Sequence, residues 1–327
     1  MRDKKSVSVI LVTYKSALEK VLRTLKSVFD QSLEDVEIIV ADDATPDFQS
    51  EILSNFLENH SPYPYKILRN LKNLGTVKNV LNASKTCNGE YIKPIGAGDI
   101  LYNRYTLENV ISYMESKKAC CCFGLMKGYT LNENSIEFID IKRPRVIDVY
   151  KKNQFEKIKK NIILGDHPSG AALFYRRDYA IKCWTAMVQN SSTKYCEDVI
   201  TYQIVLEGEV PLLYPHCVVW YEVNTGISKR DNKSKINTNM YSDILTYIDF
   251  LIDQYPNDNR LLKTKRAGCE FQIKNASHLK RFLSYLANPR KLLFELYVRI
   301  NSYNTNDFDD ESGYLVDDDW LRRFHEC

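Results

Sequence analysis

Glycine and proline are scarce in this chain of 327 residues, which contains 12 glycines and 10 prolines. This composition argues against long flexible linkers and low-complexity segments. No uninterrupted apolar run approaches about 18 residues, so the sequence predicts no membrane-spanning helix. The charged residues 1–6 precede an apolar run that Thr13 and Lys15 interrupt, so we also expect no signal peptide.

Charge and cysteine pattern exclude further classes. The formal net charge is only +3, which is too small to indicate a nucleic-acid partner for the chain as a whole. None of the 9 cysteines belongs to a Cys-x-x-Cys pair. We therefore expect buried cysteines in a reducing compartment rather than a metal or disulfide framework. In a strand, the consecutive residues Cys120–Cys122 would face alternate sides.

Strand and helix patterns alternate through the first hundred residues. Helical spacing alternates with short β-branched runs, and Ser16 and Glu19 have the spacing of a capping box. The expected strands are 7–14, 36–42, 65–70 and 89–96, and the expected helices are 16–32, 48–60 and 75–87. This order predicts an α/β fold with a mostly parallel sheet and helices on both faces.

The second half of the chain is less regular. A helix is expected at 105–117, a strand at 119–129, a strand ending in a basic turn at 169–178, a helix at 197–208 and a strand at 217–224. Residues 130–165 give no clear pattern. From about residue 231 the sequence predicts basic amphipathic helices, and the acidic residues 305–319 read as a solvated tail.

Polar residues follow three of the predicted strands. Thr13-Tyr14, Asp42-Asp43 and Gly98-Asp99 each stand at a strand's carboxyl end. In open α/β sheets, ligands bind at this edge. The sequence therefore predicts that the three clusters form one site.

The stretch "GAGDIL" could begin a dinucleotide-binding turn, but Leu101 stands where the third glycine should be. The stretch also follows the fourth strand instead of the first. A phosphate-binding P-loop is absent as well. The glycines therefore indicate a close backbone approach to a ligand, with Asp99 as the charged group.

The ordered blocks "VSVILVTYKSALEKVLRTLKSVFDQSLEDVEIIVADDATPD", "NLGTVKN…GEYIKPIGAGD" and "CEDVITYQIVLEG" resemble those of the family 2 glycosyltransferases. The resemblance covers about residues 6–230. It implies a nucleotide-sugar-binding fold of the GT-A type, and it divides the chain into a catalytic domain at 1–230 and a C-terminal helical extension at 231–327.

The resemblance implies roles for the donor side. Thr13 and Tyr14 would contact the base of a UDP-sugar, with the aromatic ring stacked on it. Asp43 resembles the carboxylate that accepts a hydrogen bond from the uracil ring, and Asp42 is its rival; either one can instead cap the following turn. Lys78 stands near a helix start, where it suits a diphosphate or is simply a solvated lysine.

The metal site is reduced relative to the family pattern. Family members usually carry Asp-x-Asp or Asp-Asp where this chain has Gly96, Gly98 and Asp99. Asp99 is therefore the implied ligand of Mg²⁺ or Mn²⁺. One carboxylate can suffice, because waters and diphosphate oxygens complete the coordination of Mg²⁺. A site without metal remains an alternative.

The pair Glu197-Asp198 resembles the family's acidic pair at a helix start, where the aspartate is the usual catalytic base. A carboxylate there would take the proton of an acceptor hydroxyl as it attacks, inverting the anomeric centre. The alternative is that the pair only favours the positive end of the helix. His167, Ser169 and Gly170 resemble the segment that lines the acceptor side.

The C-terminal helices interleave basic with apolar residues. Lys280, Arg281, Arg290, Lys291 and Arg299 alternate with leucine and phenylalanine. This pattern is typical of a helix on an anionic membrane surface, and it also suits core packing or a homodimer interface. The family resemblance implies a cytoplasmic enzyme, with peripheral contact at the inner face of the membrane.

The sequence therefore favours an inverting glycosyltransferase. It would move a sugar from a UDP-sugar to a glycan or lipid-linked glycan in the synthesis of a bacterial surface polysaccharide such as capsule or O-antigen. A catalytically inactive nucleotide- or carbohydrate-binding module is the main alternative. A nucleotidyltransferase would need a glycine-rich loop after the first strand, and "TYKSALEK" has none.

Overall fold

One mixed sheet organises the protein. The computed structural model describes residues 6–132, 135–223, 235–274 and 289–303. In these residues the strands are β1 (Val7–Thr13), β2 (Val36–Asp42), β3 (Tyr65–Arg69), β4 (Tyr91–Gly96), β5 (Ile100–Leu101), β6 (Cys121–Asn132), β7 (Ser135–Ile141), β8 (Leu173–Arg176) and β9 (Leu212–Glu222). Their order is β3-β2-β1-β4-β8-β6-β9-β5, with β7 paired to β6.

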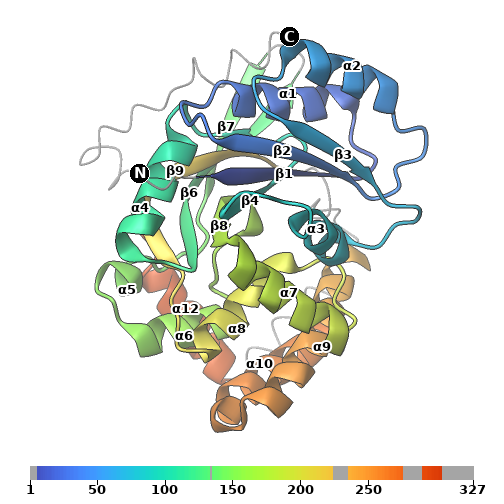
Figure 1. Ribbon diagram of the computed structural model, residues 1–327. Coiled ribbons are helices and arrows are strands. Elements are labelled where there is room, and N and C mark those ends of the chain that lie inside the picture. The colour runs from blue at the N-terminus through green and yellow to red at the C-terminus, as the bar shows by residue number, and fades with distance from the viewer. Residues whose placement is uncertain (1–5, 133–134, 224–234, 275–288, 304–327) are drawn as a thin grey trace.

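Helices cover both faces of the sheet (Figure 1). The α-helices are α1 (Leu18–Phe29), α2 (Ser50–His60), α3 (Thr76–Ser84), α4 (Thr106–Lys117), α5 (Asp148–Lys151), α6 (Phe155–Leu164), α7 (Arg177–Asn190), α8 (Ile200–Leu206), α9 (Lys235–Gln254), α10 (Asn259–Lys274) and α12 (Pro289–Ile300). Short 3₁₀ turns are η1 (Gly170–Ala172), η2 (Glu197–Val199) and η4 (Pro256–Asp258). Among the described residues, no helix combines the length and apolar character that a membrane crossing requires.

The parallel part of the sheet is the part that the sequence predicted. β1 lies between β2 and β4 and runs parallel to both, and β3 extends the parallel set beside β2. The burial of every residue in β2 is typical of a parallel strand covered on both faces. Beyond β4 the sheet becomes mixed, because β8 pairs antiparallel with both β4 and β6.

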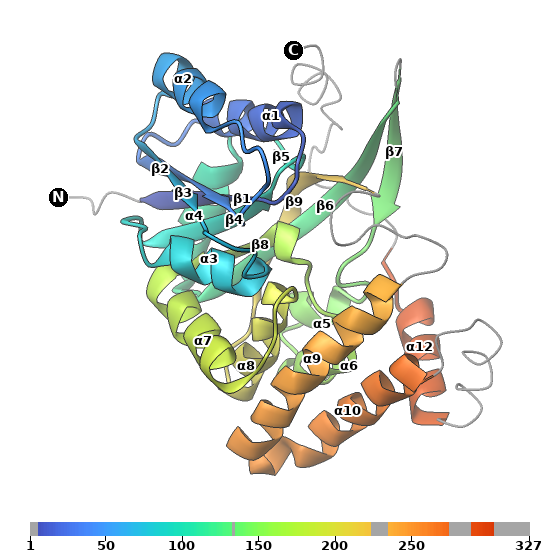
Figure 2. The same ribbon diagram turned by 90° about the vertical axis from the view of Figure 1, so that its right-hand side faces the viewer.

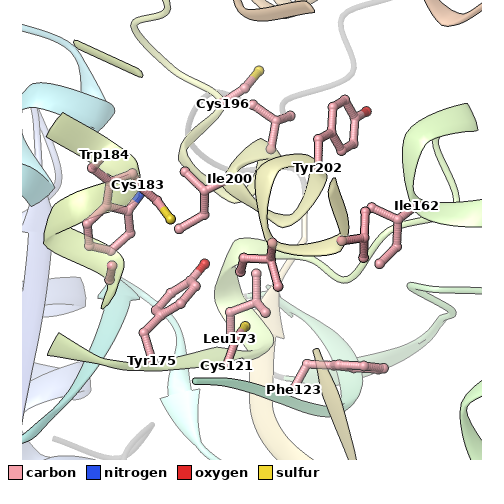
Figure 3. Close-up of a cluster of buried hydrophobic side chains, with 14 of the residues drawn as sticks. Cys121, Phe123, Ile162, Leu173, Tyr175, Cys183, Trp184, Cys196, Ile200 and Tyr202 are labelled. Carbon is pink, nitrogen blue, oxygen red and sulfur yellow. The ribbon is translucent and has the colours of Figure 1, made fainter. Parts of the chain in front are cut away.

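Two hydrophobic clusters fill the space between the sheet and its helices. Side chains of α1, α2 and α4 pack on one face, while α3, α6, α7 and α8 pack on the other. Figure 3 shows part of the second cluster, where residues of β6 and β8 meet Trp184 of α7 and Ile200 of α8. The eight cysteines in the described residues are buried and form no disulfides, so their predicted packing role is confirmed.

The C-terminal helices belong to the same core. The cluster that contains residues of α3, α6, α7 and α8 also contains fully buried side chains of these helices: Tyr247 and Leu251 of α9, Leu262 of α10 and Val298 of α12. Figure 2 shows α9 and α10 side by side beneath the sheet. The division into domains at residue 230 stays a prediction, and the tail at 305–319 lies outside the described residues.

Two local expectations were wrong. Ala17, not Ser16, is the N-cap of α1, and no side chain caps this helix. The strand expected at 169–178 ends in no basic turn: β8 ends at Arg176, and α7 begins at Arg177 and runs to Asn190. Its buried residues Ala180, Cys183, Trp184 and Met187 have the 3, 4 and 7 spacing of a helix face, which the sequence analysis did not recognise.

Candidate active site

The three polar clusters lie at one edge of the sheet. Thr13 pairs with Asp42 across β1 and β2, and Val12 pairs with Gly96 across β1 and β4. The backbone N–H of Asp43 donates to the carbonyl of Thr13 over 2.9 Å. Thr13 is buried, whereas the ring of Tyr14 is 43% exposed. An exposed aromatic ring at this edge can stack on a flat ligand.

Asp43 organises the loop that leads into α3. Its Oδ1 accepts hydrogen bonds from the backbone N–H of Leu74 over 2.8 Å and from Nδ2 of Asn70 over 2.9 Å. Its Oδ2 accepts one from the N–H of Gly75 over 2.8 Å. A carboxylate has about four acceptor positions. Asp43, which is 4% exposed, therefore keeps acceptor capacity while it holds this loop.

Asp42 is more deeply enclosed than Asp43. It is 0% exposed, its Oδ2 accepts the N–H of Thr45 over 3.0 Å, and Nε of Arg69 lies 3.6 Å away. Its Oδ1 has no hydrogen-bond partner in the described part of the chain. One oxygen of Asp42 therefore caps the following turn, as the alternative interpretation of this residue predicted.

Lys78 stands in the first turn of α3, and its side chain is exposed. Helix α3 begins at Thr76, next to the loop that Asp43 holds. A cation and free N–H groups at a helix start suit an anionic ligand. The geometry therefore brings Lys78 to the same edge as Asp43.

The loop after β4 carries Gly98 and Asp99. Asp99 is 7% exposed, and its Oδ1 accepts the backbone N–H of Glu222 over 3.1 Å. Burial raises the pKa of Asp99 to about 7, although the Glu222 N–H and the charge of Lys93 act in the opposite direction. The Thr24 hydroxyl donates to the carbonyl of Asp99 over 2.8 Å. The loop is therefore fixed by contacts from α1 and β9.

Glu222 fills the space beside Gly98, which the sequence analysis did not foresee. A Cβ built on Gly98 would overlap Oε2 of Glu222. The same oxygen lies 2.8 Å from Nζ of Lys20, and Oε1 lies 3.8 Å from Arg23. A carboxylate from β9 thus occupies the place of the side chain that residue 98 lacks, and two cations of α1 neutralise it.

We expect Gly98→Ala to lower the free energy of unfolding by about 1–3 kcal/mol, because a positive φ is strained for alanine and the new methyl meets Glu222. Gly208→Ala is the matched control, because Gly208 also has a positive φ (89°, against 106° for Gly98) but no atom within 4 Å of its added Cβ. Urea unfolding of both variants measures the difference. Equal losses would show that the contact with Glu222 has no cost.

Lys93 is a second residue that the sequence analysis missed. Its side chain is 0% exposed, and Nζ donates to the carbonyls of Ala171 over 2.5 Å and Leu173 over 3.4 Å. Burial lowers the pKa of Lys93 to about 7, and the charges of Asp99 and Glu197 oppose this shift. A buried lysine between two acidic groups is typical of a functional site.

Glu197 and Asp198 form η2 and have different environments. The Asp198 side chain is 19% exposed, and its Oδ2 lies 3.8 Å from Nδ1 of His167. The carbonyl of Glu197 accepts the indole N–H of Trp184 over 3.1 Å. Burial, together with the charge of Asp198, raises the pKa of Glu197 to about 8. Glu197 is therefore mostly protonated at neutral pH, although its residue is only partly buried.

The predicted acceptor-side residues lie beside this pair. Nδ1 of His167 is 2.9 Å from the carbonyl of Pro168; since a carbonyl only accepts, this nitrogen carries the proton. Burial lowers the pKa of His167, against the charge of Asp198. Ser169 precedes η1 as its N-cap, and a Cβ on Gly170 would overlap Oε1 of Glu197. Gly170 thus leaves room for that carboxyl group.

The mostly parallel half-sheet with helices on both faces has the GT-A fold of nucleotide-sugar-binding glycosyltransferases. Residues 8–184 match the family described as glycosyl transferase family 2. Because this match spans more than half of the chain, the chain belongs to that family and is a glycosyltransferase. The predictions of family, fold and enzyme class are therefore confirmed.

Solved structures support the fold at low identity. The crystal structure of S. aureus TarS 1–349 is 16% identical in sequence and has a TM-score of 0.55. The match covers 83% of this chain and 73% of the TarS chain. The mannosyltransferase PcManGT from Pyrobaculum calidifontis, in complex with GDP-Man and Mn²⁺, has 14% identity and a TM-score of 0.55, with coverage of 92% and 85%. No curated protein matches the chain.

Proposed function

We propose that the enzyme transfers a sugar from a UDP-sugar to a hydroxyl of a glycan or lipid-linked glycan with inversion, in bacterial surface polysaccharide synthesis. The observation that carries this proposal is the different surroundings of the Glu197 and Asp198 carboxyl groups. Oε1 of Glu197 fills the space beside Gly170, and burial raises the pKa of this group. The partly exposed Asp198 side chain lies beside His167, with its Oδ2 3.8 Å from Nδ1. Two neighbouring carboxyl groups in different environments are typical of distinct catalytic roles.

In this mechanism Asp198 is the general base. The acceptor oxygen forms a bond to the anomeric carbon while its proton passes to the Asp198 carboxylate. The bond from that carbon to the diphosphate oxygen breaks, and UDP leaves with the electron pair. Because attack and departure take place on opposite faces, the configuration inverts. His167, Ser169 and Gly170 would line the acceptor side, next to the base.

The donor assignment rests on the sheet edge and on the neighbours. TarS has also been solved with UDP-GlcNAc and with UDP, at TM-scores of 0.53 and 0.52, and PcManGT carries GDP-Man. We favour Asp43 as the acceptor of the hydrogen bond from the uracil ring N–H. Asp43 is slightly exposed and retains acceptor capacity, whereas Asp42 is fully enclosed. The exposed ring of Tyr14 supports stacking on the base, next to Thr13.

A divalent cation, Mg²⁺ or Mn²⁺, fits the donor chemistry of the loop after β4. The carboxylate of Asp99 and the carboxylate beside Gly98, from Glu222, are oxygen ligands, and Mg²⁺ is usually held by one or two carboxylates together with substrate phosphates. In the described residues, no three acidic, His or Cys side chains are arranged so that they could hold a metal ion by themselves. Asp99, helped by Glu222, would hold the ion, which would offset charge on the departing diphosphate. Lys78 would contribute from α3.

Peripheral contact with the cytoplasmic face of a membrane is supported by α12. The exposed non-proline positions of this helix are Arg290, Leu293, Leu296, Arg299 and Ile300. Apolar side chains flanked by arginines, with no acidic residue among them, suit an anionic lipid surface. Lys280 and Arg281, which also belong to the predicted basic pattern, lie outside the described residues.

A panel of nucleotide sugars tests the function. We expect slow release of UDP from one UDP-sugar without acceptor, stimulated by Mn²⁺. Binding of UDP by calorimetry without turnover of any donor, with or without candidate acceptors, would instead support the inactive binding module. Turnover of GDP-sugars alone would contradict the assignment of uracil as the nucleobase of the donor.

A further inference from the structure

The segment just before the Glu197–Asp198 pair is held by a residue far away in the sequence. Asp243 of α9 accepts hydrogen bonds from three successive backbone N–H groups: Lys194 over 2.6 Å, Tyr195 over 2.8 Å and Cys196 over 3.1 Å. Asp243 is only 8% exposed. Hydrogen bonds to a charged acceptor are about twice as strong as neutral ones. Residues 194–196 are therefore clamped to the C-terminal helices.

The other side of the same segment is fixed to the donor side of the site. The carbonyl of Lys194 accepts the N–H of Val77, in the first turn of α3, over 2.9 Å. A Cβ on Gly75 would lie only 2.7 Å from this carbonyl, and the N–H of Gly75 donates to Asp43. One continuous chain of contacts thus joins Asp43, the start of α3, residues 194–196 and Asp243.

The position of Asp198 depends on this segment. Its 3₁₀ turn has three residues. The carbonyl of Asp198 accepts the Thr201 hydroxyl of α8 over 2.8 Å, and the carbonyl of Glu197 accepts the indole N–H of Trp184 of α7. On the preceding side, the turn begins directly after Cys196, which Asp243 holds. A shift of the segment would therefore move Asp198.

We propose that Asp243 is a positioning residue for the base Asp198, so that helix α9 completes the active site without touching substrate. This inference rests on the proposed function, because it takes Asp198 as the base. It also gives α9 a catalytic purpose beyond packing. A base displaced by about 1 Å can lose about 100-fold in rate.

Steady-state kinetics of Asp243→Asn tests the proposal. The amide keeps one acceptor oxygen, but its NH₂ group faces a backbone N–H at the other position and the negative charge is lost, so the clamp is weakened. We expect kcat for sugar transfer to fall between about 10-fold and 100-fold. Donor KM and UDP affinity should change by less than about 2-fold, because Asp43 keeps its own hydrogen bonds from Asn70 and Leu74. Asp249→Asn is the matched control on the same helix, because Asp249 pairs with Arg266 at the surface. Asp243→Glu keeps the charge and is expected to retain an intermediate kcat, which provides a test even if the asparagine variant does not fold.

A double-mutant cycle separates positioning from general destabilisation. If Asp243 acts through Asp198, then Asp243→Asn has no further effect on transfer in an Asp198→Asn background. Effects that multiply, or a wild-type kcat in both Asp243 variants, would overturn the inference while leaving the proposed function intact. An Asp198→Asn enzyme with full transfer activity would overturn the proposed function itself.

Discussion

Replacing Asp198 by Asn should lower kcat for sugar transfer by between about 100-fold and 10,000-fold, the range that general base catalysis contributes. Asparagine has nearly the same shape, but it cannot take the acceptor proton. The expected loss is in kcat, while the donor KM stays close to that of the wild type, because we propose that Asp198 and the neighbouring His167 face the acceptor and not the nucleotide. Initial rates with a competent donor and acceptor measure both values.

Glu197→Gln is the matched control for this substitution. Because burial raises the pKa of Glu197 to about 8, this residue is already mostly protonated at pH 7, and glutamine imitates the protonated form. We expect transfer within about 5-fold of the wild type, less than the loss of one general base. A larger loss from Glu197→Gln than from Asp198→Asn would reverse the two roles and assign the base to Glu197.

The sequence was sufficient for the parallel half of the fold. β-branched runs alternating with helical spacing identify β1 to β4 and the helices between them. β1, β2 and β4 are buried along nearly their whole length, and the edge strand β3 is partly exposed. The antiparallel pairing of β8 with β4 and β6 could not be predicted in this way. Such pairing depends on which distant segments meet, and no local period records that.

The same distinction applies to the site. Thr13, Asp42 and Gly98 could be placed at one edge, because parallel strands bring their carboxyl ends together. Glu222 and Asp243 could not, since each acts on a loop far away in the sequence. Lys93 did leave a local signal, as a lysine in an otherwise apolar strand, but only the structure shows its burial between two acidic groups.

The proposed metal role of Asp99 leads to the second large expected effect. Asp99→Asn retains an oxygen that can accept the Glu222 N–H, so the loop should keep its shape while the charge is lost. We expect Mn²⁺ binding in the presence of UDP, followed by electron paramagnetic resonance, to weaken strongly. Metal-dependent turnover should fall about 100-fold or more, comparable to removing one electrostatic contact to a developing negative charge.

Glu222→Gln distinguishes the contribution of the Glu222 carboxylate, which comes from β9, from that of Asp99. Because Lys20 and Arg23 already neutralise Glu222, its removal should weaken Mn²⁺ binding less than Asp99→Asn does. Two observations together would exclude Asp99 as a metal ligand: wild-type turnover that persists in a chelator, and unchanged turnover in Asp99→Asn. In that case Lys20 and Arg23 would join Lys78 in offsetting the charge of the diphosphate, and Lys20→Met should then lower turnover where Asp99→Asn does not.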